Sequence, residues 1–408
     1  MDAEAAIPAA STPRTRFGAT YGDLLFGLAV AAGYVAATFA AFHWHSPVTG
    51  SFPDRMLILA ERILQGHLDS PLFRGTVDSV EIGGRFYIAV GPLQVIPYLP
   101  LAALGGFGQT AGFVVSAAFG LAAATLALPL ARAYGAKGAN AYWVALLAAF
   151  GSLLFFASVF GNFYFLAQAE SFLLLTIFLI EWAGPRRAVV LGACLGLSFL
   201  ARPTTLLAAA PFGLALVWRQ DRPIVKALAF GLPIVVALAF YGWFNWARFG
   251  SPLESGYDIS YLPQPGLEAR RALGLFSVLQ VPENLRLAFL TGFQPLGHPP
   301  FFTANPYGLS MLLVSPALVT AAWAGIRGDA GLLWAAAGLV AVPVFLYYGG
   351  GYFQYGFRYS LDFTPFLIAL VALGTARWRG LPERLLIVAS MVSVGYGILW
   401  CGNSVLRV

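Results

Sequence analysis

The chain has 408 residues, of which 59% are hydrophobic and 10% are charged. A soluble domain carries about 45–50% apolar and about 25% charged residues, so this composition excludes water as the main solvent. The net charge of +6 does not indicate nucleic-acid binding, because the 24 basic residues are scattered near the ends of apolar stretches. We therefore expect an all-α integral membrane protein.

Apolar stretches of about 20 residues, the length that one membrane crossing needs, follow one another along the chain. The first, Leu24 to Phe42, is too long for a signal-peptide core and lacks a small-residue cleavage site, so we expect it to remain as an anchor. It follows a tail, residues 1–20. About eleven spans are predicted within one membrane domain, residues 21–408: 21–43, 109–131, 140–160, 163–182, 187–202, 203–218, 227–246, 308–326, 330–348, 360–376 and 385–402.

A twelfth apolar segment, Val90 to Phe107, is interrupted by three prolines and by the pair Gly105 and Gly106. If it crossed the membrane, most of the later basic loops would face the side opposite Arg14 and Arg16. That arrangement contradicts the positive-inside rule. We therefore predict a non-spanning segment, a cytoplasmic N-terminus, and a location in the bacterial inner membrane.

This topology places two long loops on the outer face, residues 44–108 and 247–307. Both contain aromatic residues and prolines without low-complexity runs, so we expect them to be folded. Within the first loop, apolar side chains of residues 54–66 share one helical face while charged side chains avoid it. The pattern predicts an interfacial helix that lies on the membrane.

Asp54 opens this helix shortly after the first span. A carboxylate at the outer membrane surface is a candidate general base. The alternative is that Ser51 to Asp54 is a helix start, in which Asp54 caps the backbone at the positive end of the helix dipole. The sequence leaves both interpretations open.

Other polar groups stand inside or beside the spans, where they are expensive to place and are therefore candidates for function. Three polar residues stand near the outer start of one span: Glu170, Gln168 and Asn162. They are candidates for binding a polar ligand or a proton, and the alternative is that they only stabilise helix packing. Gly192 and Gly196 form a GxxxG pattern that predicts close helix packing.

Two arginines are candidates for binding phosphate. Arg202 precedes a proline at an outer helix junction, and its alternative role is to extend to the membrane surface. Arg358 stands among tyrosines in GGGYFQYGFRYSLD, and its alternative role is a helix pair with Asp362.

Metal and cofactor chemistry has little support in the sequence. A pair of nearby histidines lacks a third ligand at a fixed spacing, and both cysteines lie in apolar stretches. Phosphate-loop, dinucleotide and zincin motifs are absent. We predict no cofactor and no metal, with a divalent ion left open; the residues considered are His43, His45, His67, His298, Cys194 and Cys401.

Several segments, taken in their order, resemble the GT-C superfamily of polyprenyl-phosphate-sugar-dependent membrane glycosyltransferases, in the branch of protein O-mannosyltransferases and lipid A aminoarabinose transferases. The resemblance spans most of the chain, although no DxD or DD pair follows the first span and the turn near Asn162 lacks a second acidic residue. The segments are PDRMLILAERILQG, GGRFYIAVGPLQVIPYLPLAALGGFG, RRAVVLGACLGLSFLARPTTLL, NWARFGSPLESGY and FRYSLDFTPFLIALVALG.

The resemblance implies a GT-C-like helical bundle that transfers a sugar, with inversion, from a polyprenyl-phosphate donor to a hydroxyl acceptor on a lipid, glycan or protein at the outer face of the inner membrane. Asp54, which matches the family's first-loop acid, would take the acceptor's proton. Arg358, and second Arg202, would bind the donor phosphate. The residues expected to bind the substrate are Arg85, Tyr87, Glu170, Gln168 and Tyr355.

Two other readings compete with this one. A non-enzymatic flippase or transporter of lipid-linked sugars needs polar groups that continue to the cytoplasmic side, whereas the acidic residues there stand only at inner helix ends: Asp23, Glu181 and Asp221. A scaffold without catalysis predicts that outer-loop carboxylates and arginines are replaceable without effect.

Overall fold

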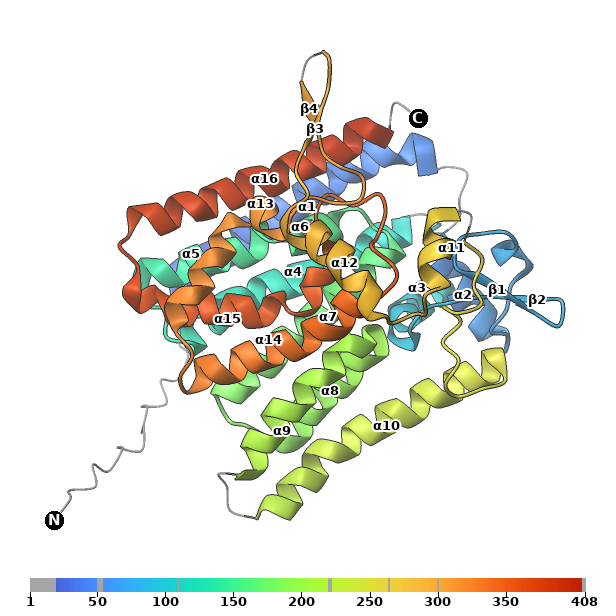
Figure 1. Ribbon diagram of the computed structural model, residues 1–408, viewed down its shortest axis with the longest axis horizontal. Helices are drawn as coiled ribbons and strands as arrows, with labels where there is room; N and C mark the ends of the chain where they lie inside the picture. Colours follow the sequence, from blue (N-terminus) through green and yellow to red (C-terminus); the bar gives the residue numbers. More distant parts are fainter. Residues whose placement is uncertain are drawn as a thin grey trace.

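The protein is a bundle of apolar helices, seen in a computed structural model that describes residues 20–49, 54–108, 110–218, 222–262, 265–298 and 301–405 (Figure 1). Within these residues, 6 helices are long and apolar enough to cross a membrane, or 7 if a pair bent by 44° counts as one span. This confirms an all-α membrane protein. The helices are α1 (Tyr21–Thr49), α4 (Thr110–Ala133), α7 (Phe163–Ala183), α10 (Pro223–Phe249), α14 (Asp329–Leu346) and α16 (Leu381–Val405), with the bent pair α5 (Gly138–Phe150) and α6 (Leu153–Val159).

The other predicted spans coincide with shorter helices, so the prediction of eleven is not confirmed. A helix of 14 residues such as α8 is about 21 Å long, less than the hydrocarbon thickness of about 30 Å. Prolines near the first position of several of these segments start 3-10 turns or short helices. The segments are α8 (Ala188–Ala201), η3 (Pro203–Ala208) with α9 (Ala209–Trp218), α13 (Met311–Val314) with η5 (Pro316–Ala324), and η6 (Arg358–Asp362), α15 (Thr364–Gly374) and η7 (Thr375–Arg377).

The first long loop is folded, as expected, and gathers at one end of the bundle (Figure 1). It contains the predicted amphipathic helix, but the apolar face of that helix, Met56 to Ala60, is buried in protein. The proline-rich segment Pro92–Leu104 and α4 pack against these residues, so protein covers much of the helix that was expected to lie on the membrane. Its position relative to the membrane stays a prediction. The elements are α2 (Arg55–Leu64), η1 (Pro71–Phe73), antiparallel β1 (Ser79–Ile82) and β2 (Arg85–Ile88), η2 (Pro92–Tyr98) and α3 (Leu99–Leu104).

The segment Pro92–Leu104 consists of a 3-10 helix followed by a short α-helix and packs on α2. Pro97 lies within the 3-10 part, and Gly105 ends α3 with φ of 72°, a value that favours glycine. Its length is below that of a membrane crossing, which agrees with the predicted non-spanning segment.

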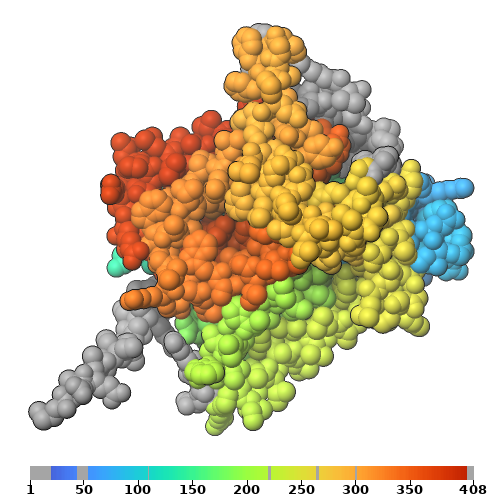
Figure 2. All heavy atoms as spheres, in the orientation of Figure 1, coloured from blue at the N-terminus to red at the C-terminus, as the bar shows by residue number. Residues whose placement is uncertain are grey.

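The second long loop is folded as well and packs on the first. The Asp78 amide donates to the Tyr261 carbonyl (3.0 Å), and the Tyr261 amide donates to the Ser79 carbonyl (2.7 Å). Arg248 at the end of α10 donates from Nη1 to the Ile88 carbonyl of β2 (2.8 Å). Figure 2 shows the second loop, in yellow to orange, across the face in view. Its elements are α11 (Pro265–Arg271), η4 (Val278–Gln280), α12 (Val281–Phe289) and the hairpin β3 (Gln294–Pro295) with β4 (Phe302–Thr303).

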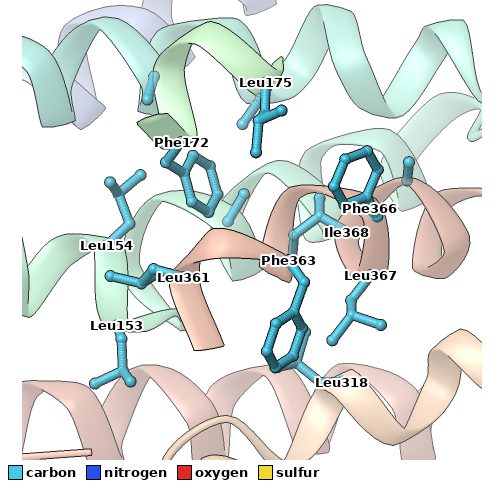
Figure 3. Close-up of a cluster of buried hydrophobic side chains, with 14 of the residues drawn as sticks. Leu153, Leu154, Phe172, Leu175, Leu318, Leu361, Phe363, Phe366, Leu367 and Ile368 are labelled. Atoms are coloured by element: carbon cyan, nitrogen blue, oxygen red, sulfur yellow. The ribbon is translucent and has the colours of Figure 1, made fainter. Parts of the chain in front are cut away.

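Part of the largest apolar cluster among the described residues lies between α6, α7, η5, η6 and α15 (Figure 3). Buried side chains such as Phe172 and Phe366 interdigitate there, and burying each large side chain stabilises the fold by about 1.5–3 kcal/mol. Because η6 is enclosed by this cluster, the residue that begins it, Arg358, has a fixed position at the border between the core and the two loops.

Candidate functional site

Asp54 is the N-cap of α2. Its Oδ1 accepts hydrogen bonds from the amides of Met56 (2.9 Å) and Leu57 (3.3 Å), while Oδ2 lies beside Gly112 at the start of α4. Burial raises the pKa of Asp54 from 3.8 to about 6, against the hydrogen bonds from the amides of Met56 and Leu57, which lower it. The capping role is therefore confirmed, and the same carboxylate is able to take a proton near neutral pH. Residues 51–53 of the expected helix start lie outside the described residues.

The next residue, Arg55, points to a different set of partners. Its Nη1 donates to the Val77 carbonyl (2.9 Å) and to the Tyr164 hydroxyl (3.4 Å), and its guanidinium lies 5.3 Å from the centre of the Phe163 ring. Neither oxygen partner is charged, so these contacts leave the charge of Arg55 uncancelled. Tyr164 stands in the first turn of α7, which Asn162 caps with a bond to the Tyr164 amide (2.9 Å).

Arg358 contacts the same tyrosine, Tyr164, through its ring. Its guanidinium lies 5.4 Å from the Tyr164 ring centre and 5.1 Å from that of Tyr359, whose hydroxyl accepts a bond from Nη2 (3.3 Å). Its buried Nε has no hydrogen-bond partner. The alternative reading of an Arg358–Asp362 helix pair is wrong, because Asp362 binds Arg202 instead.

Arg202 and Asp362 form the most enclosed ion pair among the described residues. Nε and Nη2 of Arg202 donate to both carboxylate oxygens at 2.8 to 3.2 Å, and the Thr204 hydroxyl adds a bond of 2.6 Å. Asp362 is fully buried and the Arg202 side chain is 18% exposed, so Arg202 does not extend to the surface. The pair joins the end of α8 to η6 and places Arg202 over the Tyr359 ring.

Asp78 is a residue that the sequence analysis missed. It is half-buried in the left-handed region, with φ of 62°, where its amide binds Tyr261 and its carbonyl accepts from Ala89 (2.9 Å). Burial raises the pKa of its carboxyl, while a hydrogen bond from Tyr164 and the charges of three arginines lower it; the arginines are Arg358, Arg55 and Arg271. The importance of Asp78 depends on contacts between two distant loops, for which its local sequence carries no signal.

Arg271, in the second loop, is the third arginine whose charge acts on Asp78. Its Nη1 donates to the carbonyls of Ser260 (2.5 Å) and Tyr257 (3.3 Å), next to the point where Tyr261 pairs with Asp78. Burial, followed by the charge of Asp78, raises the pKa of Tyr257. We name this set the arginine–tyrosine cluster: Arg55, Asp78, Tyr164, Tyr257, Arg271, Arg358 and Tyr359.

Glu170 and Gln168 lie deeper, on α7. Glu170 is fully buried and neither carboxylate oxygen has a hydrogen-bond partner, while the amide of Gln168 faces carbonyls of its own helix. The charges of Asp54 and Glu170 both raise the pKa of Tyr98, so this phenol lies near both carboxylates. Among the described residues, no hydrogen bond or ion pair joins the Glu170 carboxylate to the arginine–tyrosine cluster.

Three other residues predicted to bind substrate have their contacts elsewhere. Arg85 is exposed beside the turn of the β1–β2 hairpin, and Tyr87 packs against Phe249, with ring centres 5.9 Å apart. Tyr355 is buried against α16, where its hydroxyl and that of Ser393 lie 3.0 Å apart. No hydrogen bond or ring contact of these three reaches Asp54 or Arg358 within the described parts of the chain, and their roles stay predictions.

Comparisons with known proteins do not assign the chain to a family. No protein-family model matches the chain, and no curated protein matches it. In the described part of the chain, no group of three or more His, Cys, Asp or Glu side chains is placed to hold a metal ion, and Cys194 and Cys401 are free and buried. His45 lies among residues whose side chains are not described. The resemblance to GT-C enzymes therefore stays a prediction.

Proposed function

We propose that this protein is a GT-C-type glycosyltransferase with about eleven spans and an active site at the outer face of a bacterial inner membrane. It moves a sugar from a polyprenyl-phosphate donor to a hydroxyl group of a lipid, glycan or protein. The observation that carries the proposal is the start of α2, where Asp54 offers a carboxylate with a raised pKa and Arg55 joins the cluster that contains Arg358.

The proposed step is a single inverting displacement. The acceptor oxygen attacks the anomeric carbon of the sugar, the bond from that carbon to the phosphate oxygen breaks, and the bonding electrons leave with the phosphate. Asp54 takes the proton of the acceptor hydroxyl. Arg358, with a buried Nε that lacks a partner, stabilises the charge that develops on the phosphate, and Arg202 is the second candidate.

A flippase of lipid-linked sugars is the rival function. It requires polar groups along a path to the cytoplasmic side. The inner-end carboxylates that are described are already paired there, Asp23 with Arg132 (2.6 Å) and Glu181 with Arg187 (2.7 Å), and Asp221 lies outside the described residues. These ion pairs favour an enzyme with its polar site at one end of the bundle.

The test is a transfer assay in membranes with a panel of polyprenyl-phosphate sugars. Asp54→Asn should lower turnover by about 10²–10⁴-fold while donor binding survives, because an amide cannot accept the proton. The loss of capping should cost at most about 1 kcal/mol. Wild-type transfer by Asp54→Asn would exclude the proposed base.

Arg358→Ala provides the contrast. Because a phosphate-binding cation interacts with the donor before the reaction as well as during it, this variant should weaken donor binding together with the rate. Arg286→Ala, which removes an exposed arginine paired with Glu283 in the second loop, is the matched control and should retain transfer.

A further inference from the structure

The arginine–tyrosine cluster carries an excess of positive charge. None of Arg55, Arg271 and Arg358 forms an ion pair within 4.0 Å among the described residues. Their oxygen partners are uncharged: carbonyls, phenols and the hydroxyl of Ser260. The nearby pair of Arg202 and Asp362 is neutral in sum. Three guanidiniums surrounding the one carboxylate of Asp78 therefore leave at least two positive charges in a half-buried site.

Hydrogen bonds and ring contacts hold the three arginines of the cluster in place. Arg55 and Arg271 each donate to backbone carbonyls near Asp78, at Val77 and Ser260. The backbone hydrogen bonds of Tyr261 with Asp78 and Ser79 join the two loops. Arg358 is held by the ring of Tyr164 and by η6. The charges are thus preorganised and need little rearrangement when an anion binds.

We infer that the cluster prefers a lipid phosphate monoester, with two negative charges, over a lipid phosphodiester with one. This inference rests on the proposed function, in which the donor is a phosphodiester and the released carrier lipid is a monoester. As the bond from sugar to phosphate breaks, the phosphate gains one negative charge, and the two uncancelled cations stabilise that charge more than the charge of the donor. The same preference makes the released carrier phosphate a competitive inhibitor of the next turnover.

The preference is measured with the full-length protein in lipid nanodiscs at pH 8, where a phosphate monoester carries close to two charges. Farnesyl phosphate and its monomethyl ester are the probes, since they share one apolar chain and differ in charge. We expect the monoester to bind about tenfold more tightly, corresponding to one additional charge-assisted contact. Equal affinity for the two probes would overturn the inference.

Arg271 is the position that tests the origin of the preference. Arg271→Gln should remove most of the difference between the two probes, Arg271→Lys should restore it by restoring the charge, and Arg286→Gln should leave it unchanged. A difference that persists in Arg271→Gln, with the fold intact by thermal unfolding, would contradict the role of the cluster. Inorganic phosphate should compete poorly; competition equal to that of farnesyl phosphate would contradict a lipid ligand.

The binding and transfer assays separate the two proposals. A monoester preference without sugar transfer from any donor would leave the inference standing and overturn the proposed function. Sugar transfer that is not inhibited by farnesyl phosphate would support the proposed function and overturn the inference.

Discussion

Asp54 shows how one residue can serve the fold and the chemistry at once. As the N-cap of α2 it satisfies two backbone amides, and as a mostly enclosed carboxylate it has a pKa raised to about 6. Its position was predictable because an acidic residue preceded an amphipathic pattern. Its second environment, beside Gly112 and Tyr98, was not predictable, since these contacts come from the folding of the proline-rich segment over α2.

The raised pKa gives a pH dependence with a definite sign. A base acts when deprotonated, so the transfer rate should be constant above about pH 7 and fall about tenfold per pH unit well below pH 6. The phosphodiester donor does not titrate in this range. The measurement is the rate at saturating donor between pH 5 and pH 8, with Arg286→Ala as control. A rate that stays level down to pH 5 would contradict the role of Asp54 as base.

Contacts over long sequence separations explain the other differences from the sequence analysis. Arg202 and Asp362 are 160 residues apart, and their pairing removes Asp362 from the helix pair expected with Arg358. Asp78 became part of the site only through Tyr261 in the second loop. Hydropathy patterns show which side of a helix is apolar, but they do not show which distant segment of the chain packs against that side.

At the scale of elements, Arg248 connects the end of α10 to the first loop. It is 3% exposed, and it bonds to Ile88, Asn245 and its own helix carbonyl while stacking on Phe244. Replacing it with methionine keeps much of the apolar contact but removes the bond to β2. This bond is one of the contacts that join α10 to the hairpin that precedes the proline-rich segment.

Arg248→Met should release the β1–β2 hairpin without unfolding the bundle. We expect trypsin to cleave after the exposed Arg74 and Arg85 at least several times faster in this variant, because their segment opens more often. Limited proteolysis in membranes measures this, with Arg286→Met as control. Unchanged cleavage would show that apolar packing alone, such as that of Tyr87 on Phe249, holds the hairpin.

At the scale of the whole molecule, the sequence correctly predicted an all-α membrane protein, and both long loops contain regular elements (Figure 1). The number of spans was less predictable. Segments such as Pro203–Trp218 are apolar throughout, yet proline near the first position starts them as 3-10 turns and shortens the regular helix. Composition alone does not distinguish such a segment from a complete crossing.

Impermeant thiol labelling tests the topology. A cysteine at Leu104, the exposed end of α3, should react from outside intact cells if Pro92–Leu104 is non-spanning and lies on the outer face, as predicted. A cysteine at Lys137, exposed before α5, should react only after permeabilisation. Cys194 and Cys401 are buried and serve as the background. Labelling of Leu104→Cys only after permeabilisation would reverse the assigned orientation.

The placement of α10 has a consequence for how the protein responds to its bilayer. One half of this helix is pressed onto α8 at Gly192 and Gly196, where a side chain would meet the backbone of Phe230 and Pro233, and Arg248 fixes the other end to the hairpin. Its 27 residues extend about 40 Å, more than the roughly 30 Å of hydrocarbon, and a tilt of the helix would accommodate this difference. Most of its surface faces outward from the bundle. Bilayer thickness, by setting this tilt, would therefore act on the hairpin and on the site beside it.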